Sequence, residues 1–514
     1  MIKKDSVVLY SDFGAVGDGV TEDHAAIKAA HDYANHFGLK VKATEGAVYY
    51  IGNISGAAIV KTDTDWTGAK FIIDDTVVTT DADERTKNIF HIASDTQAVT
   101  YPAGKGEVGA KLDAINAAGG IDKDNFSKLD LGLGYAAMVF LINDDHMCYI
   151  RYGINQNAGS VQNEFVLIDE EGNVDPSTPL LCSYNKVTQV KVIKLDDKPI
   201  AVTGGDFETR ANIAPRRYTY YARGILVSRS NVTISKVNHV ITGEGDTGAP
   251  YNGFFNVSAC SNVTIRDSVL SAHKAYKLIT NENNTMGTYD LSFCEANALT
   301  CYNVTMYNFF SEDGVTPSVD AGYWGIMGSN YCKNLVYDSC KLTRFDAHKG
   351  TYNATIKNSD VGLLTLIGGG TFVMENSRIF TGARTYIVGL RADYGSTWDG
   401  DCILKNVSVI NKPDYAHATM AIINGGFTNH NFGYTCYMPA NVVVDNLTVS
   451  APGITTIPLA NGSITSEGVS ANVYNTEASL NPYVITKTLT IRNNAAGYNF
   501  TLPASSDFKS VEMK

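Results

Sequence analysis

The chain has 514 residues and a formal net charge of −12, with 46 glycines, 29 tyrosines and 20 phenylalanines but only three tryptophans. This length allows two ordinary domains or one long repetitive domain, and the frequent glycine and aromatic residues favour short strands and turns. The acidic balance without a lysine or arginine run excludes the usual charge pattern of a nucleic-acid binder, and no apolar run is long enough to span a membrane.

The N-terminal residues 11–38 form a glycine-rich loop followed by an amphipathic segment. The glycines do not have the G-x-G-x-x-G spacing of a dinucleotide-binding loop, and no Walker lysine follows them. Thr21 or Asp23 can cap a helix whose apolar residues recur at helical spacing up to Gly38, which suits a left-handed stop. We therefore expect this segment to be structural.

The first 100 residues are predicted to form an N-terminal cap and the first coils of a solenoid. The start "MIKKDSVVLYSD" lacks the apolar region of a signal peptide, so we expect a cytoplasmic protein or one exported with its signal removed. Between 101 and 215 the pattern changes to alternating runs separated by Asp, Asn and Gly, as in "YAAMVFLIND" and "NEFVLIDEEGNV". This alternation predicts an inserted antiparallel β-subdomain.

A repeated pattern of turn, apolar run, polar pair and second apolar run begins near residue 223, for example "SNVTISKVNHV", "SNVTIRDSVLS" and "YNATIKNSDVG". The shortest steps, from Lys333 to Tyr352 and from Tyr352 to Gly370, are 19 and 18 residues, which suits one coil of a parallel β-solenoid. Asparagine at the turn tolerates the left-handed conformation and can hydrogen-bond the asparagine of the next coil. We expect the main solenoid at 216–455 and a C-terminal β cap at 456–514.

The segment "DFGAVGDGVTEDHAAIKAAHDYA" closely resembles the N-terminal signature of the pectate-lyase-like superfamily of parallel β-helix proteins. In that superfamily the loop and helix cover the open edge of the first coil. The resemblance implies an all-β fold, a right-handed single-stranded parallel β-helix with an N-terminal capping helix, here with the inserted antiparallel β-subdomain. It does not select a function, because the superfamily includes lyases, hydrolases, transferases, epimerases and phage tailspikes.

Ionisable residues gather on strands that precede the turns of neighbouring coils. Alternate residues of a strand share a face, so Arg344, Asp346 and His348 are expected together, with Arg391 and Asp393 two coils away on the same sheet. A coil spacing of about 4.8 Å separates the two groups by roughly 10 Å, the scale of a sugar-binding groove. A solvated row of salt bridges is the structural alternative.

Long insertions after these strands are expected to bring further aromatic and ionisable side chains over the same face. Aromatic rings stack on the apolar faces of sugars, while carboxylates, histidine and arginine bind hydroxyl or carboxylate groups. Arg151 is a candidate for the rim of the groove. The candidate catalytic residues are Asp346, His348, Asp393 and Asp399, and the candidate substrate-binding residues are Arg344, Arg391, Trp324, Trp398, His430 and Tyr434.

Two reactions fit this cluster, and hydrolysis of a glycosidic bond is favoured. A glycoside hydrolase would use Asp346 with Asp393 or Asp399 as the carboxyl pair. A polysaccharide lyase would use a histidine or tyrosine as base and the arginines to neutralise a uronate carboxylate. The N-T-D, D-D, G-H-G and R-I-K motifs of polygalacturonases are absent, as is a recognisable pectate-lyase calcium triad.

The third alternative is a glycan-binding tailspike or adhesin without catalysis. In all three cases the expected partner is a poly- or oligosaccharide, with no nucleic acid and no membrane. A homo-oligomer stays open, and it would be a trimer in the tailspike-like alternative. The nine cysteines form no C-x-x-C pair, so no zinc site or disulfide framework is predicted. No metal-binding residue and no cofactor is assigned, and bound calcium stays open.

Overall fold

The computed structural model describes residues 7–78, 86–153, 157–214, 220–244, 248–271, 275–277, 285–311, 316–317, 326–413, 417–425, 430–450, 453–460, 486–494, 498–501 and 510–513. Within these ranges the chain forms many β-strands and two α-helices, α1 (His24–Phe37) and α2 (Gly106–Ala117). Neither helix is long and apolar enough to cross a membrane, as far as the described residues show.

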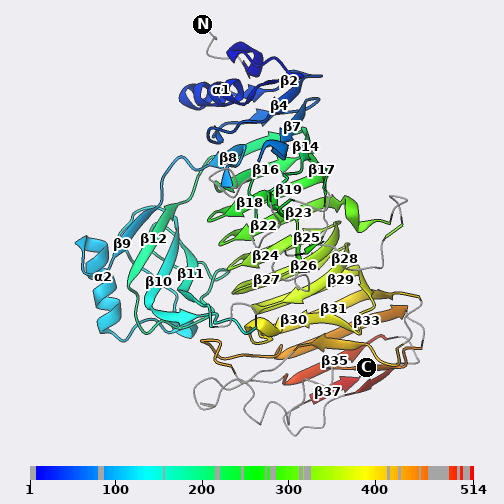
Figure 1. Cartoon of the computed structure of the whole chain (residues 1–514). Helices are drawn as coiled ribbons and strands as arrows, with labels where there is room; N and C mark the ends of the chain where they lie inside the picture. The colour runs from blue at the N-terminus through cyan, green and yellow to red at the C-terminus, as the bar shows by residue number, and fades with distance from the viewer. Residues whose placement is uncertain are drawn as a thin grey trace.

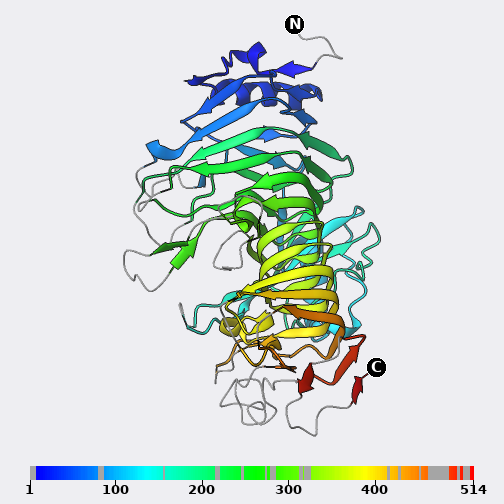
Figure 2. The same ribbon diagram turned by 90° about the vertical axis from the view of Figure 1, so that its right-hand side faces the viewer.

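Parallel strands stack coil on coil along the long axis of the molecule (Figure 1), and Figure 2 shows the same stack turned by 90°. In the longest column each strand pairs in parallel with the next. Its strands are β1 (Val8–Leu9), β3 (Val41–Lys42), β6 (Thr64–Asp65), β13 (Ile200–Thr203), β16 (Val232–Ser235), β19 (Ser261–Leu270), β23 (Asn297–Met306), β25 (Lys333–Asp338), β27 (Thr351–Lys357), β29 (Gly368–Gly382), β31 (Trp398–Asn411), β33 (Asn441–Ser450), β35 (Thr488–Arg492) and β37 (Ser510–Met513).

Two further columns complete the coils. One consists of β5 (Ala58–Val60), β8 (Phe90–Ala93), β15 (Ile225–Ser228), β18 (Asn252–Ser258), β22 (Tyr289–Cys294) and β24 (Ile326–Asn330). Farther along the axis come β26 (Lys341–Asp346), β28 (Asp360–Leu366), β30 (Tyr386–Leu390) and β32 (Ala421–Asn424). The other column starts with β2 (Asp18–Glu22), β4 (Val48–Ile51), β7 (Lys70–Asp74), β14 (Asp206–Arg210) and β17 (Asn238–Thr242). The predicted parallel β-helix, which the N-terminal resemblance implies, is confirmed.

The inside of the coils is one continuous apolar core, which runs from Val8 to Ile491. The turn asparagines form the predicted ladder on the outside. Asn334 and Asn353 have φ values of +59° and +52°. Asn353 Nδ2 donates to Asn334 Oδ1 at 3.0 Å, and Asn334 Nδ2 donates to Asn297 Oδ1 at 2.8 Å. The amide ladder therefore keeps successive coils in register where the backbone turns.

The glycine-rich loop and α1 cover the N-terminal end of the solenoid (Figure 1). Asp23 is the residue that precedes α1, but its carboxylate accepts hydrogen bonds from Val16 N at 2.6 Å and Gly17 N at 3.1 Å instead of capping the helix. Gly38 ends the helix with φ +66°, as predicted. The N–H groups of Val16 and Gly17 are thus used by the buried carboxylate of Asp23, which holds the loop in place.

His31 fastens α1 to the first coils through a buried chain of hydrogen bonds. Trp66 Nε1 donates to Tyr10 Oη at 2.7 Å, and Tyr10 Oη lies 2.9 Å from His31 Nε2. Because the tyrosine hydroxyl already accepts from tryptophan, its own proton is donated to an unprotonated His31 Nε2. Burial lowers the pKa of His31 to about 3.

This histidine is expected to make the protein sensitive to acid. Unfolded histidine binds a proton below about pH 6.5, whereas folded His31 binds one only near pH 3, so folding stability is lost as the pH falls through this window. At pH 5 the loss from His31 amounts to about 2 kcal/mol. Chemical unfolding at pH 7 and pH 5 should show this loss in the wild type and not in His31→Gln, whose amide oxygen replaces the acceptor. Equal losses in both proteins would contradict the assignment.

The insertion is an antiparallel sheet that lies beside the solenoid (Figure 1). Its strand order is β11 (Ser160–Ile168), β10 (Ala137–Cys148), β12 (Gln189–Lys194) and β9 (Val99–Pro102). The helix α2, which the sequence analysis did not predict, covers the face turned away from the solenoid. Its Leu112 packs there with Val139 and Val190.

Strands β13 and β14 already belong to the solenoid, so the chain returns to it at Ile200 and not near residue 216. Alternating runs with Asp, Asn and Gly turns place "TQVKVIKLDDKPIAVTGG", up to the pair Gly204 and Gly205, in the predicted antiparallel insertion. In the structure this pair turns the chain from one column to the next. Past residue 455, β35 and β37 continue the longest column, and the division into four parts otherwise stays a prediction.

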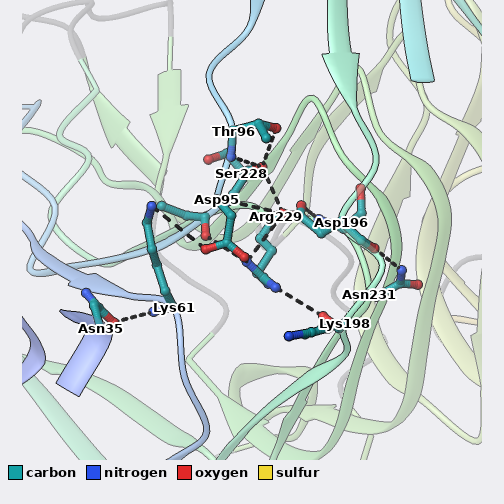
Figure 3. Close-up of polar contacts among 12 residues, drawn as sticks. Asn35, Lys61, Asp95, Thr96, Asp196, Lys198, Ser228, Arg229 and Asn231 are labelled. Carbon is teal, nitrogen blue, oxygen red and sulfur yellow. Dashed lines mark hydrogen bonds and ion pairs between the residues drawn. The ribbon is translucent and has the colours of Figure 1, made fainter. Parts of the chain in front are cut away.

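Arg229 holds the root of the insertion, where the chain leaves and re-enters the solenoid (Figure 3). Its Nη1 lies 3.0 Å from Asp95 Oδ2 on the outgoing segment and 3.3 Å from Asp196 Oδ1 on the returning one. Its Nη2 donates to Lys198 O at 3.1 Å. The side chain is 2% exposed, so one buried guanidinium fixes both connections.

A second buried ion pair fixes the insertion farther along the solenoid. Lys333, on β25, is 1% exposed and lies 3.8 Å from Glu164 Oε2 on β11. Its Nζ donates to Phe165 O at 2.8 Å and to Pro179 O. Burial lowers the pKa of Lys333 to about 8, against the opposing charge of Glu164. The inserted sheet is therefore fixed to the solenoid at both points.

Candidate functional site

The two predicted groups of ionisable residues do lie two coils apart on one column. Asp346 pairs with Thr365 on β28, and Thr365 pairs with Gly389 on β30. The gap of about 10 Å expected between the groups is nevertheless closed by Arg391. Its Nη1 reaches Asp346 Oδ1 at 3.1 Å, because a long side chain spans the intervening coil. The predicted groove between Asp346 and Asp393 is therefore wrong: an arginine occupies that space.

Arg391 also binds Asp393 through two parallel contacts, Nε to Oδ1 at 3.0 Å and Nη2 to Oδ2 at 2.8 Å. Arg344 Nη1 lies 3.8 Å from Asp346 Oδ2. Burial alone would raise the pKa of Asp346, but the charges of Arg391 and Arg344 hold it below its ordinary value. Burial of Asp393 is likewise outweighed by its hydrogen bond with Arg391, and its pKa is lowered. Both carboxyl groups are ionised at neutral pH.

The insertion completes this cluster. Arg151 Nη2 lies 3.0 Å from Asp393 Oδ2, and Tyr152 N donates to Asp393 O at 2.9 Å. Ile150 N donates to Phe432 O at 3.0 Å. The segment after β10 is thereby fastened between two loops of the solenoid. Arg151, proposed as a groove rim, takes part in a contact that joins the two parts of the chain.

His348 lies beside this ion cluster. It is partly buried, and its ring centroid is 5.6 Å from that of Tyr394. Burial and the nearby charge of Arg391 lower the pKa of His348 to about 3. The imidazole is neutral at physiological pH, and its capacity to take up a proton there is weak.

The predicted aromatic residues lie in different places. Trp398 is fully buried, and its Nε1 donates to Gly370 O at 3.0 Å, so it belongs to the core and its prediction as a sugar platform is wrong. The error arises because Trp398 begins β31 and does not lie in the preceding loop. His430 is 9% exposed and packs on Phe432 at 4.9 Å between ring centroids. Trp324 lies outside the described residues.

A cavity of about 300 Å³ opens where the insertion meets the solenoid, and we call it the seam cavity. The insertion contributes Lys123, His146 and Gln162, and the solenoid contributes Asp399, Tyr434 and Tyr437. Asp399 is the one member of the four predicted catalytic residues that lines it. Its side chain is 39% exposed, and its Oδ2 lies 3.8 Å from Lys123 Nζ. The carboxylate of Asp399 is thus accessible to solvent and lines the seam cavity.

The rings of the seam cavity are held by polar contacts at their edges. Tyr434 Oη donates to Tyr394 O, and its ring centroid lies 5.0 Å from that of Tyr149. Tyr437 is fixed through its backbone, because its N donates to Thr397 Oγ1 at 2.8 Å and its O accepts from Trp398 N at 2.7 Å. Burial and the charge of Asp399 raise the pKa of Tyr437.

The sequence analysis missed Lys123, His146, Gln162 and Tyr437. None of them lies in a repeat of the solenoid, and three belong to the insertion. A usable signal was the polar run Gln162, Asn163 and Glu164 in the first half of β11, whose second half is apolar. Among the described residues no group of three or more His, Cys, Asp or Glu side chains is arranged to hold a metal ion.

No family model matches this chain, and no curated protein matches it. Among solved structures it is similar to the tailspike protein gp49 from Pseudomonas phage LKA1, with 11% identity, a TM-score of 0.42, and coverage of 98% of this chain and 84% of that one. PfbA, a surface adhesin of Streptococcus pneumoniae, has 12% identity and a TM-score of 0.40, over 98% of this chain and 97% of that one.

An endo-xylogalacturonan hydrolase from Aspergillus tubingensis is also similar, with 12% identity and a TM-score of 0.34 over 92% of this chain and 98% of that one. At such low identities and scores, these likenesses assign no activity to this chain. The parallel β-helix is instead established by the chain's own coils, and the insertion beside it forms the seam cavity.

Proposed function

We propose that this chain binds a poly- or oligosaccharide in the seam cavity. The observation that carries the proposal is the composition of the walls: hydrogen-bonding side chains such as Gln162 and Thr435, an open carboxylate in Asp399, and the rings of Tyr434 and Tyr437. Sugar rings present hydroxyls at their edges and apolar C–H faces, so they match polar groups that alternate with aromatic rings. The resemblance of the N-terminal segment to β-helix proteins that act on carbohydrates agrees with this choice.

Hydrolysis of the bound glycan is the second candidate function, and the solvent exposure of the Asp399 side chain favours it. This side chain is 39% exposed and faces the cavity, with Oδ2 3.8 Å from Lys123 Nζ, so it is placed to act on a bound glycan as a base or a nucleophile. Asp346 and Asp393 do not fit as the carboxyl pair, because arginines neutralise both and neither carries a proton at neutral pH. A complete hydrolase would need a separate proton donor.

Replacing Asp399 by asparagine is expected to weaken glycan binding about 10- to 100-fold, because a hydrogen bond to a charged group contributes about 1.5–3 kcal/mol. Calorimetric titration with a panel of oligosaccharides measures this effect. The matched control is Asp113→Asn, on the exposed side of α2 and away from the cavity, which should bind like the wild type. An unchanged affinity of Asp399→Asn for every bound glycan would contradict the proposed site.

Mass spectrometry of the same mixtures separates the two candidate functions. Products that carry one added water and disappear in Asp399→Asn would establish hydrolysis at this carboxylate. Intact oligosaccharides after long incubation, together with measurable affinity, would leave binding as the function. If no glycan of the panel binds, the proposed function itself is contradicted.

A further inference from the structure

A second hollow of about 400 Å³ adjoins the seam cavity on the insertion. It shares three lining residues with the seam cavity, His146, Gln162 and Ser183. Beyond them it reaches Asp122 and Asn185. The two hollows adjoin at these three residues, and we call the pair the seam cleft.

Backbone and amide contacts give the seam cleft a rigid wall. Gln162 Nε2 donates to Ser183 O at 3.0 Å, and Lys123 N donates to Ser183 Oγ at 3.1 Å. Asn143 Nδ2 donates to Asn185 Oδ1 at 2.9 Å. The wall therefore presents fixed amide and hydroxyl groups, and little conformational entropy would be lost when a ligand binds.

The charge balance of the seam cleft is slightly acidic. Lys123 is the only lysine or arginine among the described residues that line it. Its ammonium is already shared between Asp124 Oδ1 at 3.1 Å and Asp399 Oδ2 at 3.8 Å. Although burial opposes the effect, the hydrogen bond to Asp124 and the charge of Asp399 raise the pKa of Lys123.

The arginines near the seam cleft are held elsewhere. Arg391 binds Asp346 and Asp393, and Arg151 binds Asp393, and neither arginine lines the cleft. A carboxylate entering the cleft would therefore meet Asp399 and Asp122 without a free cation to compensate it. Such a group loses hydration and is repelled, whereas a neutral hydroxyl or amide finds partners along the wall.

Building on the proposed glycan binding, we propose that the seam cleft takes a neutral oligosaccharide of at least two sugar units and excludes uronate chains. One unit would lie in the seam cavity against Tyr434 and Tyr437, and the next in the adjoining hollow against Asn185. Both hollows fall within the range of small-molecule sites, about 300–1,000 Å³. This substrate class is the opposite of the one that a lyase acting on uronates would need.

The first experiment compares neutral and uronate oligosaccharides of matched length by calorimetric titration with the full chain. We expect neutral chains to bind at least about 10-fold more tightly than uronate chains, and the matching monosaccharides to bind more weakly than the disaccharides. Uronates that bind as tightly as neutral chains would overturn the inference and leave glycan binding intact. Failure of every sugar to bind would contradict the proposed function instead.

Two variants test whether successive sugar units of one chain occupy the two hollows. Asn185→Ala removes a polar group from the adjoining hollow, so affinity for oligosaccharides should fall while that for monosaccharides stays unchanged. Lys186→Ala is the matched control, since this exposed neighbour does not line the cleft. A loss of monosaccharide and oligosaccharide affinity to the same extent, or no loss at all, would overturn the two-unit arrangement.

Discussion

Arg391→Met is expected to lower the free energy of unfolding by about 3 kcal/mol, the low end of the range for breaking a buried ion pair. The variant leaves Asp346, whose side chain is 6% exposed, with Arg344 alone at 3.8 Å, and it removes the bidentate partner of Asp393. Chemical unfolding followed by circular dichroism measures the loss. Arg391→Lys should recover part of it, because lysine restores the charge but not the bidentate geometry.

The chain offers a close control for this prediction. Arg378 makes a similar bidentate contact with Asp360, at 2.7 and 2.6 Å, but its side chain is 50% exposed. Arg378→Met should therefore cost no more than about 1 kcal/mol. If Arg391 bound substrate and not the fold, Arg391→Met would keep wild-type stability and lose glycan affinity, which is the opposite of what we expect.

Lys333→Met is expected to cost about 3–5 kcal/mol, because it leaves Glu164 buried without its counter-charge. Glu164 is 3% exposed and would retain its hydrogen bonds from Leu181 N and Cys182 N, at 2.7 and 3.0 Å. The backbone carbonyls of Phe165 and Pro179 would lose their donor. The loss should be concentrated in the inserted sheet, so amide exchange should quicken in β10 and β11 before it does in β31.

The control for this prediction is Lys405→Met, on the exposed side of β31, which should change stability by no more than about 0.5 kcal/mol. An unfolding curve of Lys333→Met that coincides with that of the wild type would show that the pair is dispensable. Faster amide exchange throughout the solenoid would equally contradict a role confined to the insertion.

The two predictions share one structural cause. The seam cleft exists because a separate sheet lies against the solenoid, and ion pairs hold this sheet at three places: Arg229 at its root, Lys333 at its middle and Asp393 near its far end. Asp393, a candidate catalytic residue in the sequence analysis, thus serves to position the walls of the cleft. The candidate ligand groups lie next to these contacts and not within them.

Local patterns could be predicted from the sequence because they depend on residues close together in the chain. The helix α1 follows from the apolar spacing between Asp23 and Gly38, and the glycine ends it because a left-handed residue is needed there. The coils follow from the repeated runs and the turn asparagines, whose positive φ values and amide ladder were both expected. The helix α2 was missed because the alternating runs that follow it led the whole segment 101–215 to be interpreted as strands.

Only the tertiary structure decided the site. That Asp346 and Arg391 share a face could be predicted from strand alternation, but not that the guanidinium spans a coil and neutralises the carboxylate. The approach of Lys123 to Asp399 joins an inserted domain to a late coil, and no local pattern encodes such a contact. Alternation and turn chemistry are properties of neighbouring residues, so the sequence by itself determined the β-helix, whereas the cleft depends on how two separately folded surfaces pack.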